Sequence, residues 1–121
     1  MLAWSSPQSP DRLGEFGEWY ENTHIPQIRA AVTSIIAVSR YELVDPESTE
    51  PSHRYLAVYE LDDDDIPAAA AALAQSAAAG RMEMTTAMNM TDHPPTAQWY
   101  RASTVVPRGS EVPRGSGKGR P

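Results

Sequence analysis

The stretch from Glu15 to Pro26, EFGEWYENTHIP, concentrates side chains that can do chemistry. It holds an imidazole at His24 and a phenol at Tyr20, and this spacing places the two side chains on one face of a helix. A half-buried imidazole titrates near neutral pH and can move a proton on a bound carbonyl compound, while a phenol can donate a hydrogen bond to an oxyanion. The stretch therefore predicts a catalytic pair, His24 as acid/base and Tyr20 as its hydrogen-bond partner.

A helix over this stretch has to position the pair. Asp11 can cap its N-terminus, and counting 100° per residue from Leu13 gathers several side chains on one face. That face holds Phe16, Gly17, Tyr20, His24 and Ile28, whereas Glu15, Glu18 and Asn22 lie on the outward side. Pro26 lacks the amide that would bond to the Asn22 carbonyl, so we expect the helix to kink or end there.

Each of these residues also has a purely structural interpretation. The ring of His24 could pack at the helix end and bond a backbone carbonyl before Pro26. Trp19 and Tyr20 form either an aromatic wall for a ligand or ordinary packing of a helix on a sheet. The paired methionines of RMEMTTAMNM, Met84 and Met88 among them, are better explained as flexible filling of a pocket or dimer seam than as a copper site.

The remaining elements predict an α+β fold. Strands are expected over residues 1–5, 34–44, 54–61 and 97–104, and a second helix from a cap at Asp65, with Pro67 in its first turn, to a stop at Gly80. The order β-α-β-β-α-β is the split βαβ pattern of ferredoxin-like folds, with one antiparallel sheet and both helices on one face. We expect a single domain over residues 1–104.

Both faces of the expected strands carry apolar residues. Strict alternation from Ser34 to Val44 places Ile35, Ala37, Ser39, Tyr41 and Leu43 on one face and Ile36, Val38, Arg40 and Glu42 on the other. Because two helices cover only one face of a sheet, the other face needs a partner, and a second copy of the chain is the economical candidate. The pattern does not decide which face Tyr41 and Tyr59 occupy.

The run EFGEWYENTHIPQI, with the strands ending in SRYEL and RYLAVYEL, resembles the EthD-like small proteins of the dimeric α+β-barrel superfamily. The resemblance implies a homodimer whose two sheets close an eight-stranded barrel, with a ligand cleft between each sheet and its helices and a histidine beside it. The departure from this resemblance is Gly17, a poor helix former within the first helix, which leaves room for a ligand or another backbone.

Relatives with this signature include cyclases, isomerases, decarboxylases and monooxygenases that act without cofactors on polyketides, lactones and aromatic acids. The resemblance therefore implies a cofactor-independent enzyme, a cyclase, isomerase, decarboxylase or related lyase. Residues expected to contact its polyketide-like, lactone or aromatic carbonyl substrate are Phe16, Trp19, Tyr41, Tyr59, Met84 and Met88. The alternatives are a non-catalytic dimeric small-molecule-binding or accessory protein, a structural interaction domain and a cofactor-free monooxygenase of the same fold.

Composition narrows the functional classes. The chain has no cysteine, which excludes disulfide scaffolds and thiol catalysis, and its three histidines lack metal-ligand spacing, so we expect no metal and no cofactor. Residues 1–106 carry fifteen acids against six arginines, a balance that disfavours nucleic acid. No apolar run suits a membrane span or signal peptide, and a cytoplasmic location is expected.

The C-terminal residues 105–121 differ in kind from the body. They are basic, rich in Gly, Pro and Arg, and contain the pentapeptide VPRGS twice. Such a composition buries nothing, so we expect a disordered tail. The pentapeptide also resembles the thrombin cleavage sequence of expression vectors, which indicates that part of the tail is vector-derived and not part of the fold.

Overall fold

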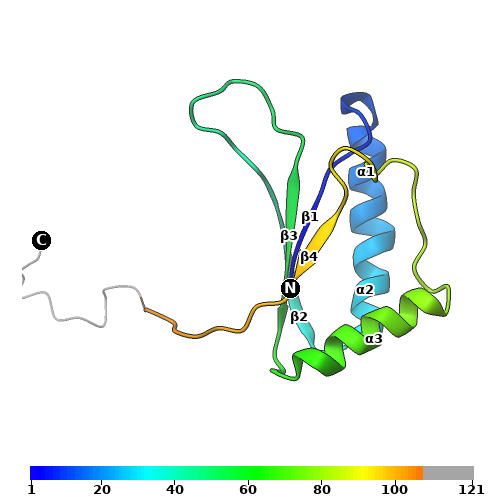
Figure 1. Ribbon diagram of the computed structural model, residues 1–121, viewed down its shortest axis with the longest axis vertical. Helices are drawn as coiled ribbons and strands as arrows, with labels where there is room; N and C mark the ends of the chain where they lie inside the picture. The colour runs from blue at the N-terminus through cyan, green and yellow to red at the C-terminus, as the bar shows by residue number, and fades with distance from the viewer. Residues whose placement is uncertain (108–121) are drawn as a thin grey trace, which may run out of the picture.

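The computed structural model describes residues 1–107 and has an α+β architecture. Four strands form one antiparallel sheet in the order β2-β3-β1-β4; they are β1 Leu2–Ser5, β2 Ile35–Glu42, β3 Tyr55–Leu61 and β4 Thr96–Gln98. The helices lie together on one side of this sheet (Figure 1). The predicted α+β class with an antiparallel sheet is confirmed, and the arrangement is compatible with a ferredoxin-like fold. The predicted disordered tail lies, from residue 108 on, outside the described residues.

The helical segments are η1 Pro10–Arg12, α1 Leu13–Trp19, η2 Tyr20–His24, α2 Ile25–Ala31 and α3 Ile66–Ala78. Of the two outcomes expected at Pro26, an end of the helix is wrong, because α1, η2 and α2 follow one another without a break. The segment η2 is a π-helical turn, in which the Ile25 amide bonds to the Tyr20 carbonyl. Pro26 follows this wide turn in the first turn of α2, where a missing amide is best tolerated.

Helix α3 follows its sequence signals closely. The carboxylate of Asp65 accepts a hydrogen bond from the Ala68 amide at 3.1 Å, which caps the N-terminus as predicted. Pro67 occupies the first turn, and Gly80 has a φ of +75° just beyond the last turn, the left-handed conformation that commonly ends helices. Both predicted boundaries of this helix are therefore confirmed.

Strand β2 contains a β-bulge that strict alternation does not anticipate. Its register with β3 shifts between Ile35 and Ala37, so Ile36 is the extra residue and is 59% exposed. Ile35 is buried in the core with Tyr59, whereas Ala37 pairs beside Glu60. The prediction that Ile35 shares a face with Ala37 is wrong, because one inserted residue reverses the alternation.

The closing strand is shorter than the expected span of residues 97–104. In β4, Gln98 already pairs with Leu2 at the start of β1. Strand β1 begins at Leu2, so it offers β4 no paired residue beyond Gln98. The pairing therefore stops at Gln98, and Trp99 is only partly buried against the core.

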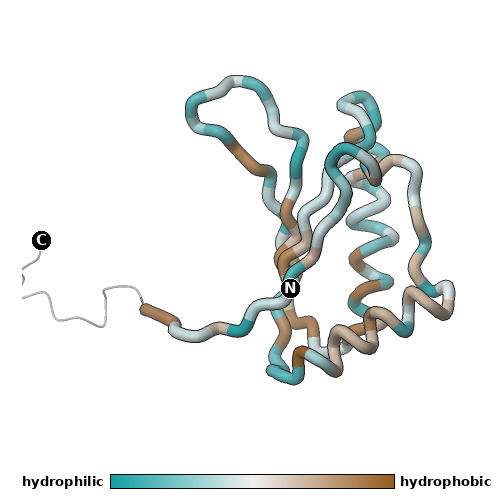
Figure 2. The backbone as a smooth tube through the Cα atoms, in the orientation of Figure 1, coloured by the Kyte–Doolittle hydropathy of each residue, from teal (hydrophilic) through white to brown (hydrophobic). Residues whose placement is uncertain are grey.

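The register shows which side chains share a face of the sheet. The pairs Leu2↔Val58 and Trp4↔Leu56 lie on the side away from the helices, next to Tyr41 and Ser39 of β2. The helix side carries the buried core, which is Met1, Phe16, Trp19, Tyr20, Ile28, Val32, Ile35, Ala57, Tyr59, Ala69, Ala87 and Met88. Apolar stretches colour the strands brown, and much of the β2–β3 connection is polar (Figure 2).

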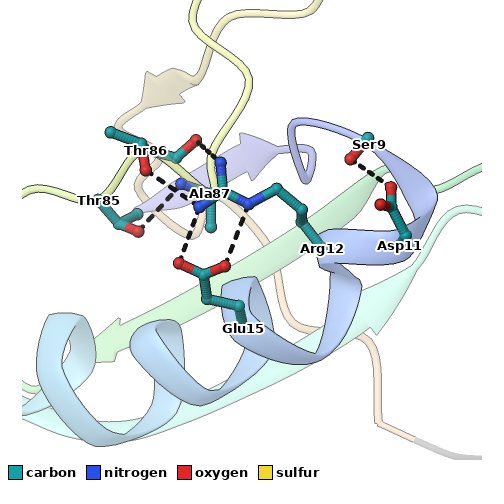
Figure 3. Close-up of polar contacts among 7 residues, drawn as sticks. All are labelled: Ser9, Asp11, Arg12, Glu15, Thr85, Thr86 and Ala87. Carbon is teal, nitrogen blue, oxygen red and sulfur yellow. Dashed lines mark hydrogen bonds and ion pairs between the residues drawn. The ribbon is translucent and has the colours of Figure 1, made fainter.

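The methionine-rich segment between α3 and β4 has no regular structure and is tied to the first helix. The guanidinium of Arg12 donates to the Thr86 carbonyl and hydroxyl, both at 3.0 Å, while it also forms a two-pronged pair with Glu15 (Figure 3). Further along, the Trp19 indole donates to the Glu83 carbonyl at 3.1 Å. These bonds hold the segment alongside the helix that carries His24.

Candidate functional site

His24 lies against two aromatic rings at the end of the π-helical turn. Its ring stacks on Trp19, with centroids 4.5 Å apart and planes inclined by 20°, and meets Tyr20 edge-on at 4.9 Å. The Nδ1 atom is buried and has no hydrogen-bond partner. The alternative in which the ring caps a helix end is wrong, because the helix continues through Pro26 and Nδ1 bonds to no carbonyl of the described chain.

The environment of His24 changes its protonation. Burial lowers its pKa to about 4, because desolvation disfavours the charged imidazolium. Both ion pairs of residues 1–107 are formed by arginines, so no carboxylate offsets this desolvation at the ring. The expected titration near neutral pH is therefore wrong, and His24 is a neutral imidazole at pH 7.

Next to His24 two phenols form a buried pair. The Tyr59 hydroxyl donates to the Tyr20 hydroxyl at 3.2 Å, and the two residues are only 1% and 2% exposed. Burial raises the pKa of both phenols above their ordinary value, so both stay protonated. The predicted partner of His24 thus belongs to a short chain of polar groups that crosses from the helix to β3.

Arg40 completes this site, and sequence reasoning missed it. Its guanidinium carbon lies 4.5 Å from the centre of the Tyr20 ring, a cation–π geometry, and its Nη1 is 3.0 Å from the carboxylate of Glu21. A Cβ at Gly17 would lie 3.9 Å from the same nitrogen, so the glycine makes the helix surface shallow where the guanidinium sits. Strict alternation places Arg40 on the same strand face as Val38. A charged residue beside apolar neighbours on one face was the sequence signal that could have identified Arg40.

The structure brings together five of the predicted site residues. They are His24, Tyr20, Trp19, Phe16 and Tyr59, and with Arg40 they form what we name the His24 cluster. Phe16 is fully buried and meets Tyr20 at 5.8 Å in a T-shaped arrangement. The helical spacing predicted that Phe16, Tyr20 and His24 lie together, whereas it left the face of Tyr59 open and did not include Arg40.

The other three predicted contact residues lie elsewhere. Tyr41 is 56% exposed and sits on the opposite side of the sheet, next to Leu56. Met84 is 63% exposed in the segment beside the helix. Met88 is buried where its backbone pairs with Pro7. These positions depend on strand register and on an irregular segment, which alternation and composition do not specify.

One cavity of the described residues adjoins the His24 cluster at Tyr59. A cavity of about 540 Å³ at the end of the sheet is lined by Tyr59, Trp99 and the acidic turn at residues 62–64. Tyr59 is the residue that this cavity shares with the cluster. A second cavity, of about 260 Å³, lies where β1 ends and shares no lining residue with the cluster.

Residues 1–107 contain no group of three His, Asp or Glu side chains arranged to hold a metal ion. No helix over the same residues has both the length and the apolar character needed to cross a bilayer. In comparisons with known proteins, no family model, no curated protein and no solved structure matches this chain. The EthD-like resemblance therefore rests on the residues quoted for it.

Proposed function

We propose that the chain is a cofactor-independent small-molecule enzyme that does acid/base chemistry on an aromatic, lactone or polyketide-like carbonyl compound. One observation carries the proposal: a neutral, half-buried imidazole, His24, stands beside the hydroxyl pair of Tyr20 and Tyr59. Buried ionisable groups with strongly shifted pKa values are commoner at functional sites than elsewhere. Isomerisation, cyclisation and decarboxylation of such compounds all require a proton to be moved.

The geometry of His24 limits which atom acts. Its Nδ1 is buried, so Nε2 is the nitrogen that a bound molecule would contact. In a neutral imidazole one nitrogen carries a proton and the other a lone pair. Depending on the tautomer, Nε2 either donates to a carbonyl oxygen or accepts a proton from the carbon beside it.

The neighbouring groups suit a developing negative charge. The Tyr59 hydroxyl donates to that of Tyr20, which leaves the Tyr20 proton for an oxyanion. Arg40 places a positive charge on the face of the same ring. An enolate formed next to His24 would thus meet a phenol and a nearby cation, while Trp19 would supply a flat apolar wall.

The proposed assembly is a homodimer of ferredoxin-like subunits, as the EthD-like resemblance implies. The side of the sheet away from the helices supports this, because the apolar residues Leu2, Trp4, Leu56 and Val58 pair there across β1 and β3 and stay partly exposed. Closing two such faces on each other would bury the patch and complete a barrel. We call these four residues the open-face patch.

A second candidate is a non-catalytic module that binds a small molecule or serves as an accessory subunit. The observation that favours it is that His24 does not line the cavity of about 540 Å³ or the cavity of about 260 Å³, while Phe16, Tyr20 and Tyr59 are packed as core. In this candidate the neutral imidazole is only a packing element, and its replacement changes stability without changing any reaction.

Proton exchange separates the two candidates. A panel of aromatic β-diketones and aryl ketones in D₂O is followed by NMR for loss of the proton next to the carbonyl, with and without protein. We expect exchange above the buffer rate for at least one compound, a fall to the buffer rate for His24→Gln and a partial loss for Tyr20→Phe. Asn22→Ala is the matched control, because Asn22 is exposed on the outward side of the same helical segment.

If a compound exchanges as fast with folded His24→Gln as with the unmodified chain, His24 has no part in the chemistry. Exchange at the buffer rate over the whole panel, with a compound nevertheless bound, favours the non-catalytic module. Circular dichroism of each variant shows whether the fold has survived the substitution.

A further inference from the structure

The cavity of about 260 Å³ where β1 ends has a chemistry of its own. We name it the Arg54 cleft; its polar lining includes Ser6, Ser52, His53, Arg54, Asn89 and His93. Three separate segments contribute, namely the turn after β1, the β2–β3 connection and the segment before β4. The cleft shares no residue with the His24 cluster.

The charge of the cleft opposes that of the rest of the chain. One arginine and two histidines line it, and no aspartate or glutamate does, although residues 1–106 carry a large excess of acids. Within residues 1–107 the Arg54 guanidinium forms no ion pair with a carboxylate. It donates to the Ser6 hydroxyl at 3.0 Å and lies 5.9 Å from the ring of Trp4, which leaves other N–H groups of its fork without an acceptor.

His53 holds an unusual backbone conformation at the cleft. Its φ is +54°, the left-handed region that non-glycine residues rarely adopt. Its Nδ1 is buried without a hydrogen-bond partner. A residue strained in its backbone and incompletely bonded in its side chain adds little to the fold, and such residues gather at binding sites. A neutral imidazole carries its proton on one of its two nitrogens, and the tautomer with the proton on Nε2 brings a donor to the cleft.

Asn89 fixes the opposite wall. Its side-chain oxygen accepts from the amides of Thr91, Asp92 and His93 at 2.9, 3.1 and 3.2 Å, and its own amide donates to the Ser6 carbonyl at 2.8 Å. Asn89 is 7% exposed, so this arrangement is part of the packed structure. The turn over residues 89–93 therefore holds His93 rigidly at the cleft. It is bonded to the segment of Ser6, to whose hydroxyl Arg54 donates.

We propose that the Arg54 cleft binds the carboxylate group of a small organic acid, with the fork of Arg54 as the main contact and His53 and His93 as flanking donors. A guanidinium matches a carboxylate in a planar, two-bond geometry. Pro7, Pro10 and Leu43 give the cleft an apolar wall for the organic part. The strongly acidic residues 1–106 repel a doubly charged phosphate more than a singly charged carboxylate. This difference favours the carboxylate as the ligand.

Benzoate tests this proposal, with benzamide as the neutral compound of the same shape and inorganic phosphate as the competing anion. Each is titrated into the full chain labelled with ¹⁵N, at constant ionic strength, and backbone amide shifts are followed. We expect benzoate to saturate shifts at Ser6, Arg54 and His93, and benzamide to need at least tenfold more. Arg54→Gln should weaken benzoate binding at least tenfold, whereas Arg29→Gln, the same change on the exposed face of α2, should leave it unchanged.

His53→Gly keeps the test decisive if Arg54→Gln unfolds the chain. Glycine suits the left-handed conformation, so this variant should melt no lower than the unmodified chain and still bind benzoate at least threefold more weakly. Equal shifts with benzoate and benzamide would overturn the proposal. Unchanged affinity in folded Arg54→Gln or His53→Gly would do the same, and saturation by phosphate with no response to benzoate would overturn the choice of a carboxylate.

Discussion

The imidazole of His24 lies flat against the indole of Trp19, with ring centroids 4.5 Å apart. The stacking covers one face of the imidazole, and Tyr20 meets the ring edge-on at 4.9 Å. With its Nδ1 also buried and unbonded, the ring is kept neutral by its surroundings. An uncharged histidine at physiological pH is therefore a structural property of this chain, and it leads to a prediction on stability.

The free energy of unfolding should depend on pH through His24. Its pKa is about 4 in the folded chain and 6.5 ordinarily, so below pH 6.5 the unfolded state binds more protons and stability falls as the pH falls. The loss between pH 7.5 and 5.5 should be about 1 kcal/mol. Urea unfolding of the unmodified chain and of His24→Gln at both pH values measures this loss. The carboxylates contribute equally to the pH dependence of both chains, so the difference between the chains leaves the contribution of His24. Equal pH dependence in the two chains would contradict the buried, neutral ring.

The two phenols of Tyr20 and Tyr59 should be energetically coupled. Removing either hydroxyl leaves the other buried without this partner, at a cost of about 1 kcal/mol for Tyr20→Phe and for Tyr59→Phe. The double variant leaves no orphaned hydroxyl, so its loss should be smaller than the sum of the two single losses. A double-mutant cycle by urea unfolding measures the coupling, and strictly additive losses would show that the hydroxyls do not interact.

Two glycines should respond oppositely to alanine. Gly17 lies within α1, and a Cβ there would make only an ordinary contact with Arg40 at 3.9 Å, so Gly17→Ala should stabilise the chain by about 0.5–1 kcal/mol. Gly80 has a φ of +75°, which alanine adopts only with strain, so Gly80→Ala should destabilise it by about 1 kcal/mol. Thermal unfolding of the pair, each against the unmodified chain, checks both signs. A loss of stability in Gly17→Ala would show that the Arg40 guanidinium needs the room.

The open-face patch should mediate dimer formation. Val58 pairs with Leu2 near the middle of this face, so Val58→Lys should convert a dimer into a folded monomer. Met84→Lys is the control, because Met84 is exposed outside the sheet. Light scattering coupled to gel filtration gives the mass of each form over a range of concentrations. A monomer for the unmodified chain at every concentration would reject the homodimer, and a dimer that survives Val58→Lys would place its interface elsewhere.

Elements specified by local signals were predictable from the sequence. The cap at Asp65 and the left-handed Gly80 bound α3 as expected, because each acts through its own backbone neighbours. The aromatic face that gathers Phe16, Tyr20 and His24 was predictable for the same reason, since helical spacing alone places these side chains together.

Features set by long-range pairing were not predictable. The bulge at Ile36 arises from the register of β2 against β3, and β4 stops where β1 begins, so neither can be read from one strand. The continuation through Pro26 depended on a π-helical turn that no local pattern announces. The place of Arg40 over Tyr20, and the low pKa of His24, follow from which groups the fold brings together.

The most direct test of the proposed chemistry is the pH dependence of proton exchange in a responsive aromatic ketone. The rate for the unmodified chain, less that for His24→Gln, should stay constant from about pH 8 to 5.5 and reach half its value near pH 4, where the ring becomes charged. That result would show that a neutral, buried His24 moves the proton. A fall centred near pH 6.5, or no difference from His24→Gln at any pH, would contradict it.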